Sequence, residues 1–208
     1  LKPICQVGIP AGIQSTVINF SNALLQSSVN SFGSTTMAGY TAANNIFGFL
    51  YVSVNAITQA CMSFTSQNYG LRKLKRMDKI LIDCLILTVV VSLVLGGGVY
   101  LFGAEILRLY TEEAEVIRCG IEIFAYTTVT YFLCGIMDLF PGALRGMDRS
   151  TVPMILSVIG TVGTRIVWVF WLFPAHRSLA FLFISYPASW LITIAIICFY
   201  FVRRKVHG

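Results

Sequence analysis

Residues Thr35 to Gly70 read TTMAGYTAANNIFGFLYVSVNAITQACMSFTSQNYG, with no Asp, Glu, Lys or Arg among them. A helix needs about 20 residues, each rising about 1.5 Å, to cross the hydrocarbon core of a bilayer, and this run is longer than that. It is followed directly by LRKLKRMDK, in which five of nine residues are basic. The pattern predicts a membrane-spanning helix that ends at a charged, aqueous boundary.

The composition of the whole chain agrees with a membrane protein. Of its 208 residues, 56% are hydrophobic and 12% are charged, whereas about a quarter of the residues in a soluble domain are charged. The predicted fold class is therefore an all-α membrane protein, a six-transmembrane-helix bundle. We expect its spans at about residues 7–32, 36–69, 80–102, 114–144, 152–173 and 179–202.

The basic residues predict the orientation, because Lys and Arg collect in cytoplasmic loops. With six spans, one side receives eleven of the 15 basic residues: Lys2, Arg72, Lys73, Lys75, Arg76, Lys79, Arg145, Arg149, Arg203, Arg204 and Lys205. We expect a multi-pass protein of the plasma membrane (cell inner membrane) with both ends in the cytoplasm. The basic loop 72–79 is then expected to touch anionic lipid headgroups, and the net charge of +6 does not indicate nucleic acid.

Uncharged polar residues form a line on each of the first two spans. At about 100° per residue, steps of three and four place Ser15, Asn19, Asn22, Gln26 and Asn30 near one face, and Asn45, Asn55 and Gln59 near another. Lipid tails cannot hydrogen-bond these groups, so they face other helices or water. Amides that join helices remain an alternative, but two consecutive lines favour a shared aqueous cavity. The predicted cavity-lining residues are Asn19, Gln26, Asn45, Asn55 and Gln59.

Ionisable residues inside the predicted spans are further candidates. A carboxylate within a span is rare and often functional, so Asp138 is a candidate for coupling to a proton or cation. The alternative role for Asp138 is a structural partner for a nearby amide or base. Glu122 and Arg165 lie at matching depths and are predicted to form a structural ion pair. The six cysteines are far apart without a CxxC pair, so we expect no metal site, and no cofactor besides a coupling ion.

Three stretches resemble the multidrug and toxic compound extrusion (MATE) transporters. They are GIPAGIQSTVINFSN at residues 8–22, TQACMSFTSQNYGLRKLKRMDK at 58–79 and GALRGMDRSTVPM at 142–154. The resemblance implies twelve helices in two six-helix lobes, with alternating access to a central cleft driven by sodium ions or protons. This chain is similar to the C-terminal lobe, residues 1–208 forming one lobe. The N-terminal six-helix lobe of the same transporter would be its partner.

The chain also departs from that family in one respect. Some members carry acidic residues in the seventh and tenth helices for cation binding, and the matching positions here fall at Ile18 and near Cys134. The cation site of those members is therefore not carried over to this sequence. Other members use an acidic residue in the first lobe.

The resulting functional hypothesis is a secondary active antiporter that exports organic compounds, cationic ones in particular, using a sodium or proton gradient. Its expected partners are a small organic substrate and membrane lipid. A lipid-linked oligosaccharide flippase is an alternative, but it would need a strongly cationic cavity and Arg165 stands alone. A membrane enzyme would need a cluster of catalytic residues, whereas His176 and His207 lie outside the spans. A non-transport receptor or scaffold is the remaining alternative.

Overall fold

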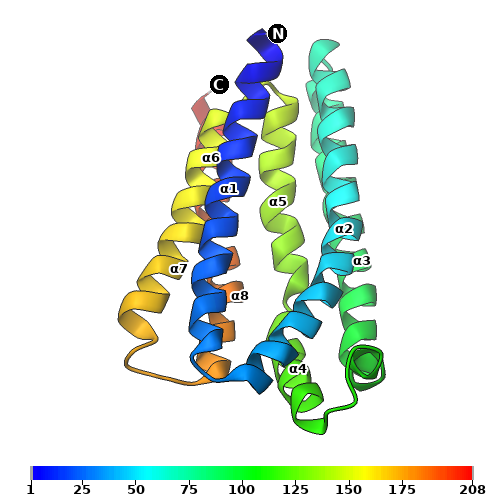
Figure 1. The fold of residues 1–208 in the computed structure, drawn as a ribbon. Coiled ribbons are helices and arrows are strands. Elements are labelled where there is room, and N and C mark those ends of the chain that lie inside the picture. The colour runs from blue at the N-terminus through cyan, green and yellow to red at the C-terminus, as the bar shows by residue number, and fades with distance from the viewer. Residues whose placement is uncertain (1, 208) are drawn as a thin grey trace.

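The computed structural model describes the backbone of residues 2–207 and the side chains of residues 5–201, and no strand occurs among them. Its long helices run side by side, with both chain ends at the same end of the bundle (Figure 1). The elements are α1 (Lys2–Asn30), α2 (Ser34–Gly70), α3 (Leu74–Arg108), α4 (Ala114–Thr127), α5 (Tyr131–Gly146), α6 (Thr151–Ser157), η1 (Val158–Gly163), α7 (Thr164–Val167), η2 (Trp168–Leu172) and α8 (Leu179–His207).

Four of the described helical stretches are long and apolar enough to cross a bilayer unaided: Ser34–Gly70, Leu74–Arg108, Thr151–Leu172 and Leu179–Phe201. The bent pair of α4 and α5 is a fifth if it is one span. α1 has 29 residues and carries the first line of amides, which makes it more polar than the others. The predicted class, an all-α membrane bundle, is confirmed. α3 is longer than its predicted range because the helix continues into the charged boundary on both sides.

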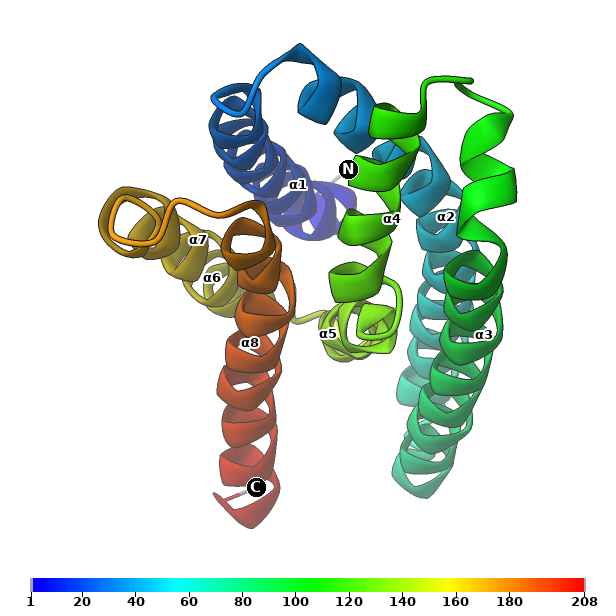
Figure 2. The same ribbon diagram turned by 90° about the horizontal axis from the view of Figure 1, so that it is seen from below.

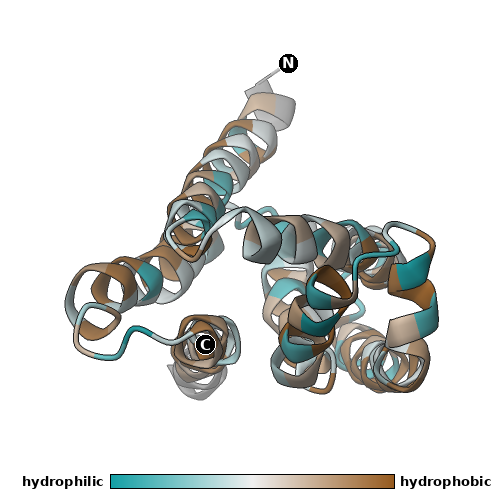
Figure 3. Ribbon diagram, turned by 60° about the horizontal axis from the view of Figure 1, so that its bottom comes forward, coloured by the Kyte–Doolittle hydropathy of each residue, from teal (hydrophilic) through white to brown (hydrophobic). Residues whose placement is uncertain are grey.

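The helices form two groups joined by a central pair. Seen from below, α1, α6, α7 and α8 lie on one side and α2 and α3 on the other, with α4 and α5 between them (Figure 2). α2 packs against α5 and α3, while α5 also packs against α8, and α1 packs mainly against α6, α2 and η1. α3 is rich in hydrophobic residues, drawn brown in Figure 3, and its exposed Ile82, Ile86 and Val94 suit contact with lipid.

The predicted fourth span, residues 114–144, is not one straight helix. α4 and α5 meet at an angle of 53° across a short break. Three threonine hydroxyls at the break donate to carbonyls four residues earlier: Thr127 to Ile123 at 2.6 Å, Thr128 to Phe124 at 2.6 Å and Thr130 to Tyr126 at 3.1 Å. Such back-bonding competes with the helical ladder and bends helices, which accounts for the break.

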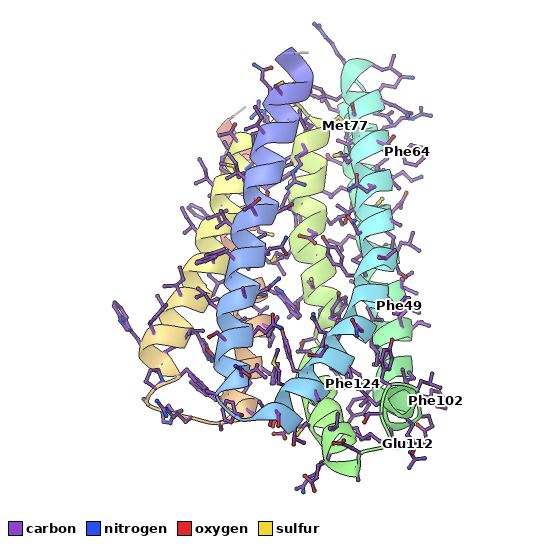
Figure 4. All side chains as sticks on the ribbon, in the orientation of Figure 1. Phe49, Phe64, Met77, Phe102, Glu112 and Phe124 are labelled. Carbon is purple, nitrogen blue, oxygen red and sulfur yellow. The ribbon has the colours of Figure 1, made fainter. Side chains whose placement is uncertain are left out.

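Aromatic side chains form the core at the level of this break. Phe47 of α2 packs edge-on against Phe124 of α4, with ring centroids 5.6 Å apart, and stacks on Tyr131 of α5 at 6.0 Å. Tyr131 in turn packs edge-on against Trp190 of α8 at 6.0 Å. Offset and edge-on pairs of this kind contribute about 0.5–1.5 kcal/mol each beyond their burial. Figure 4 contrasts the buried Phe124 with Phe49, which projects outward from α2.

α3 approaches the break through a glycine. A Cβ placed on Gly96 would lie 2.6 Å from the carbonyl oxygen of Thr128, whereas one on the next residue, Gly97, would have nothing within 4 Å. Contacts under 3.0 Å do not occur for real Cβ atoms, and a backbone carbonyl cannot swing aside as a long side chain can. The absence of a side chain at Gly96 therefore permits the close contact between α3 and the break.

These two glycines provide a matched test of that packing. We expect Gly96→Ala to lower the free energy of unfolding by about 1–3 kcal/mol, because an added methyl group must displace the Thr128 backbone. Gly97→Ala should be neutral or slightly stabilising, since alanine favours helix by up to about 1 kcal/mol over glycine. Thermal unfolding of the intact protein in detergent measures both, and equal midpoints would contradict the contact.

Candidate functional site

The amides on α1 divide between two directions. Asn19 and Gln26 are exposed. Asn22 is half-buried and its Oδ1 accepts a hydrogen bond from Nη1 of Arg165 at 2.5 Å. The predicted line of amides on α1 is thus not a single exposed face, because Asn22 is bonded to an arginine inside the bundle.

The amides on α2 are mostly exposed. Asn45 and Gln59 are exposed and Asn55 is half-buried, and Nε2 of Gln59 donates to Oδ1 of Asn55 at 3.5 Å. Asn45 also lines a groove of about 440 Å³ with Thr41 and residues 110–116 at the turn between α3 and α4. In the view of Figure 1, α1 and α2 both lie at the front of the bundle, with α5 between and behind them. The role of the five amides in a cavity stays a prediction.

Asp138 of α5 belongs to a polar cluster that reaches both of these helices. Its half-buried carboxylate interacts with the hydroxyl of Tyr51 on α2 and with the guanidinium of Arg145, two turns further along α5. Nη2 of Arg145 donates to Oε1 of Gln14 on α1 at 2.5 Å, while its buried Nε has no partner in the described part of the chain. The cluster therefore connects α1, α2 and α5 through a single carboxylate, a phenol and a cation.

Arg165 of α7 forms a second cluster inside the bundle. Only 4% of its surface is exposed, and its Nε donates to Oγ of Ser189 on α8 at 3.4 Å, in addition to the Asn22 bond. Its guanidinium carbon lies 4.7 Å from the centroid of the Tyr186 ring, a cation–π contact. The Tyr186 hydroxyl lies 3.4 Å from that of Tyr40 on α2. A positive charge inside the lobe is thus surrounded by neutral oxygens and an aromatic face.

The predicted ion pair between Glu122 and Arg165 is wrong. Glu122 lies on the exposed side of α4, and the polar partners of Arg165 are Asn22 and Ser189. Equal depth along two helices does not determine whether their side chains face each other, and the bend between α4 and α5 makes a straight-helix estimate worse. Arg165 is instead satisfied without a carboxylate.

The sequence reasoning missed Gln14 and Tyr51 as members of the Asp138 cluster. Gln14 is seven residues before Ser21, and both are buried on the inner side of α1, away from the exposed Asn19. The spacing of seven residues between these two polar side chains could have indicated a second polar line on α1, facing the interior. Tyr51 carried none, because only the packing of α2 on α5 brings its hydroxyl toward Asp138.

Comparison with known proteins shows which proteins the chain resembles. A protein-family model described as MatE matches residues 10–171. The probable multidrug resistance protein YoeA of Bacillus subtilis is 23% identical over 206 residues, which is 97% of this chain and 44% of YoeA. The probable multidrug resistance protein NorM of Thermotoga maritima is 22% identical over 190 residues, 89% of this chain and 38% of NorM.

A solved structure shows the same fold. The Vibrio cholerae MATE transporter VcmN in its bent form matches with a TM-score of 0.86 at 16% identity, over 96% of this chain and 45% of VcmN. The chain thus spans less than half the length of each of these three proteins.

The correction at Arg165 has a measurable consequence for stability. We expect Arg165→Gln to destabilise the intact protein by about 1–3 kcal/mol, because it leaves the side-chain oxygens of Asn22 and Ser189 without their donor. Glu122→Gln should leave the thermal midpoint unchanged, since this side chain is exposed and outside the cluster. If Glu122→Gln lost as much stability as Arg165→Gln, the result would support an ion pair between Glu122 and Arg165 and contradict this account.

Proposed function

The chain belongs to the MatE family, and we propose that it is one lobe of a secondary active antiporter that exports organic cations. The family indicates a transporter embedded in the membrane rather than an enzyme. In our proposal the other half of the transporter is an N-terminal six-helix lobe, and substrate passes between the two lobes by alternating access. Repeated halves with a binding site near the membrane midplane are common in secondary transporters.

The observation that carries the proposal is the position of Asp138. Its carboxylate lies on α5, between two helices whose exposed sides carry neutral amides. A proton or sodium ion can neutralise this carboxylate, and so can the charged group of an organic cation. Because one carboxylate balances one monovalent cation at a time, the coupling ion and the substrate compete for it, which is the requirement for exchange.

Arg145 has a defined part in this scheme. It interacts with Asp138 but donates its Nη2 hydrogen bond to Gln14. A guanidinium held by the amide of α1 leaves the carboxylate available to another cation, whereas a guanidinium turned to Asp138 would occupy it. We infer that Gln14 keeps the coupling residue open.

The exposed amides suit a variable organic substrate. Asn19, Gln26, Asn45 and Gln59 offer donors and acceptors without a charge of their own, so they do not compete with Asp138 for a cation. The flippase alternative would need accessible positive charge for a pyrophosphate. Arg165 does not offer this, because it is buried and already bonded to two neutral side chains.

The proposed topology places both chain ends in the cytoplasm of the cell that bears the transporter. The turn between α2 and α3 and the turn between α5 and α6 lie at the same end of the bundle as the two chain ends (Figure 1). Arg72 and Lys73 lie in the first turn, Lys75 and Arg76 follow at the start of α3, and Arg149 lies in the second turn. Because basic residues collect on the cytoplasmic side, this end is the inner one, where the basic turn meets anionic headgroups.

Uptake of a cationic dye into vesicles tests the coupling role. With the full-length transporter and imposed sodium or proton gradients, we expect Asp138→Asn to reduce gradient-driven dye transport by about tenfold or more, because the amide cannot exchange cations. The matched control is Asp83→Asn, which removes an exposed carboxylate from α3 and should transport normally. Full transport by Asp138→Asn would remove this residue from the mechanism, and no transport by the wild type under either gradient would refute the antiport itself.

A further inference from the structure

A second cavity lies at the end of the bundle that we assign to the cytoplasm. Its volume is about 510 Å³, and it is bounded by the first turns of α1 and by the connection between α5 and α6. Its lining includes Cys5, Gln6 and Ile9 on one side and Asp148, Ser150 and Thr151 on the other. The volume is within the range of about 300–1,000 Å³ that small-molecule sites occupy.

Asp148 adopts a left-handed backbone conformation, in which glycine or asparagine is more usual than aspartate. Its φ of 57° is left-handed, and the turn after α5 is closed by bonds from the backbone N–H groups of Asp148 to Arg145 and of Arg149 to Leu144, each 3.1 Å. Glycine or asparagine is usual at such a position, and a left-handed side-chain residue costs roughly 1–2 kcal/mol. Within residues 5–201 the Asp148 carboxylate has no hydrogen-bond or ion-pair partner, so the turn itself does not require it.

Ser150 supplies an independent observation on the other wall. It is 4% exposed, and its hydroxyl oxygen has no hydrogen-bond partner in the described part of the chain. Serine preceding a helix normally uses this oxygen to accept a backbone N–H, but Ser150 makes no such bond to α6. A buried hydroxyl left unpaired costs about 1–3 kcal/mol. Ser150 thus brings an unused hydrogen-bonding group to the wall of the cavity.

The chemistry of the lining selects the ligand. A carboxylate, a buried hydroxyl, the Thr151 hydroxyl and the Gln6 amide all offer oxygen acceptors, while Ile9 and Pro10 supply apolar surface. An anion would be repelled by Asp148, and a fully apolar molecule would leave these acceptors unpaired. We propose that this cavity binds small organic ammonium compounds, with the N–H groups on Asp148 and Ser150 and the apolar part on Ile9 and Pro10.

In the transporter this cavity would receive cations on the cytoplasmic side, before they reach Asp138. That role as a loading site rests on the proposed function, whereas the binding of an ammonium group does not. The two are separable because Cys5, an exposed thiol in the cavity wall, reports on binding without transport.

The test measures reaction rates at Cys5 in the purified full-length transporter. Two methanethiosulfonates are compared, one with an ethylammonium group and one with a neutral methyl group. In each case the Cys5 thiolate attacks the sulfenyl sulfur, a disulfide forms and methanesulfinate leaves, and the mass of the peptide containing Cys5 gives the rate. We expect the ratio of the ammonium rate to the neutral rate to fall about threefold in Asp148→Asn, because the carboxylate concentrates cations near the thiol.

Asparagine keeps the left-handed turn, and Asp83→Asn is the control for removal of one exposed carboxylate at the same end of the protein. Benzylammonium should slow the neutral reagent at Cys5 in the wild type and in Asp83→Asn. Its protection should weaken in Asp148→Asn and in Ser150→Ala.

Three results would overturn the proposal: an unchanged rate ratio in Asp148→Asn, no protection of the wild type by benzylammonium, or a wild-type Cys5 that neither reagent modifies. If the Cys5 results are as expected but the wild-type transporter moves no dye, the binding site stands and the antiport proposal fails. If dye transport depends on Asp138 but the Cys5 ratio is unchanged, the antiport stands and this cavity has no part in it.

Discussion

The guanidinium of Arg165 is the interaction on which the arrangement of this lobe depends. A charge in a low-dielectric interior must be hydrogen-bonded, and its partners come from two other helices: Asn22 from α1, and Ser189 and Tyr186 from α8. Tyr186 extends the contact to Tyr40 of α2. The position of the cation within α7, between two π-helical stretches, is a local irregularity of the kind common near functional residues. Satisfying one buried charge thus fixes the relative positions of four helices.

α1 is held by two such contacts. Gln14 binds Arg145 of α5, and eight residues later Asn22 binds Arg165 of α7. α1 makes its main backbone contacts with α6, α2 and η1, and these two amide–arginine bonds tie it across the bundle to α5 and α7. Its remaining amides, including Asn19 and Gln26, are exposed. A helix with so many amides can therefore bond the interior on one side and still present a polar surface on the other.

Much of the fold could be predicted from the sequence, because a bilayer imposes a length and an apolar composition that are visible in the residues. The long uncharged runs predicted α2 and α8, and the basic clusters predicted which turns share an end of the bundle. The break at Thr127 to Thr130 was missed, since threonine is ordinary in a helix until its hydroxyl competes for the backbone carbonyls. The sequence alone could not pair Arg165 correctly. Periodicity gives the direction of a side chain around its own helix, but not which neighbour it meets.

In the candidate site, too, features within one helix could be predicted from the sequence, whereas contacts between helices could not. Asp138 was identifiable because a carboxylate in a predicted span is conspicuous, and Arg145 lies on the same face of its helix seven residues later. Gln14 and Tyr51 come from other helices, so only their packing against α5 associates them with this carboxylate. Ser150 and Asp148 could not be identified from the sequence at all. What marks them is an unpartnered hydroxyl and a left-handed backbone, and neither can be read from a pattern of residue types.

The close approach of Gly96 to Thr128 has a further consequence for a protein in lipid. Irregular backbone is tolerated within the hydrocarbon layer only where other protein atoms cover it, since hydrocarbon offers no hydrogen bonds. Between α4 and α5 the cover comes from α3 on one side, and Thr127 and Thr128 are buried. The lack of a side chain at one residue of α3 is thus what allows that helix to cover the Thr128 peptide group, where a neighbouring span changes direction inside the bilayer.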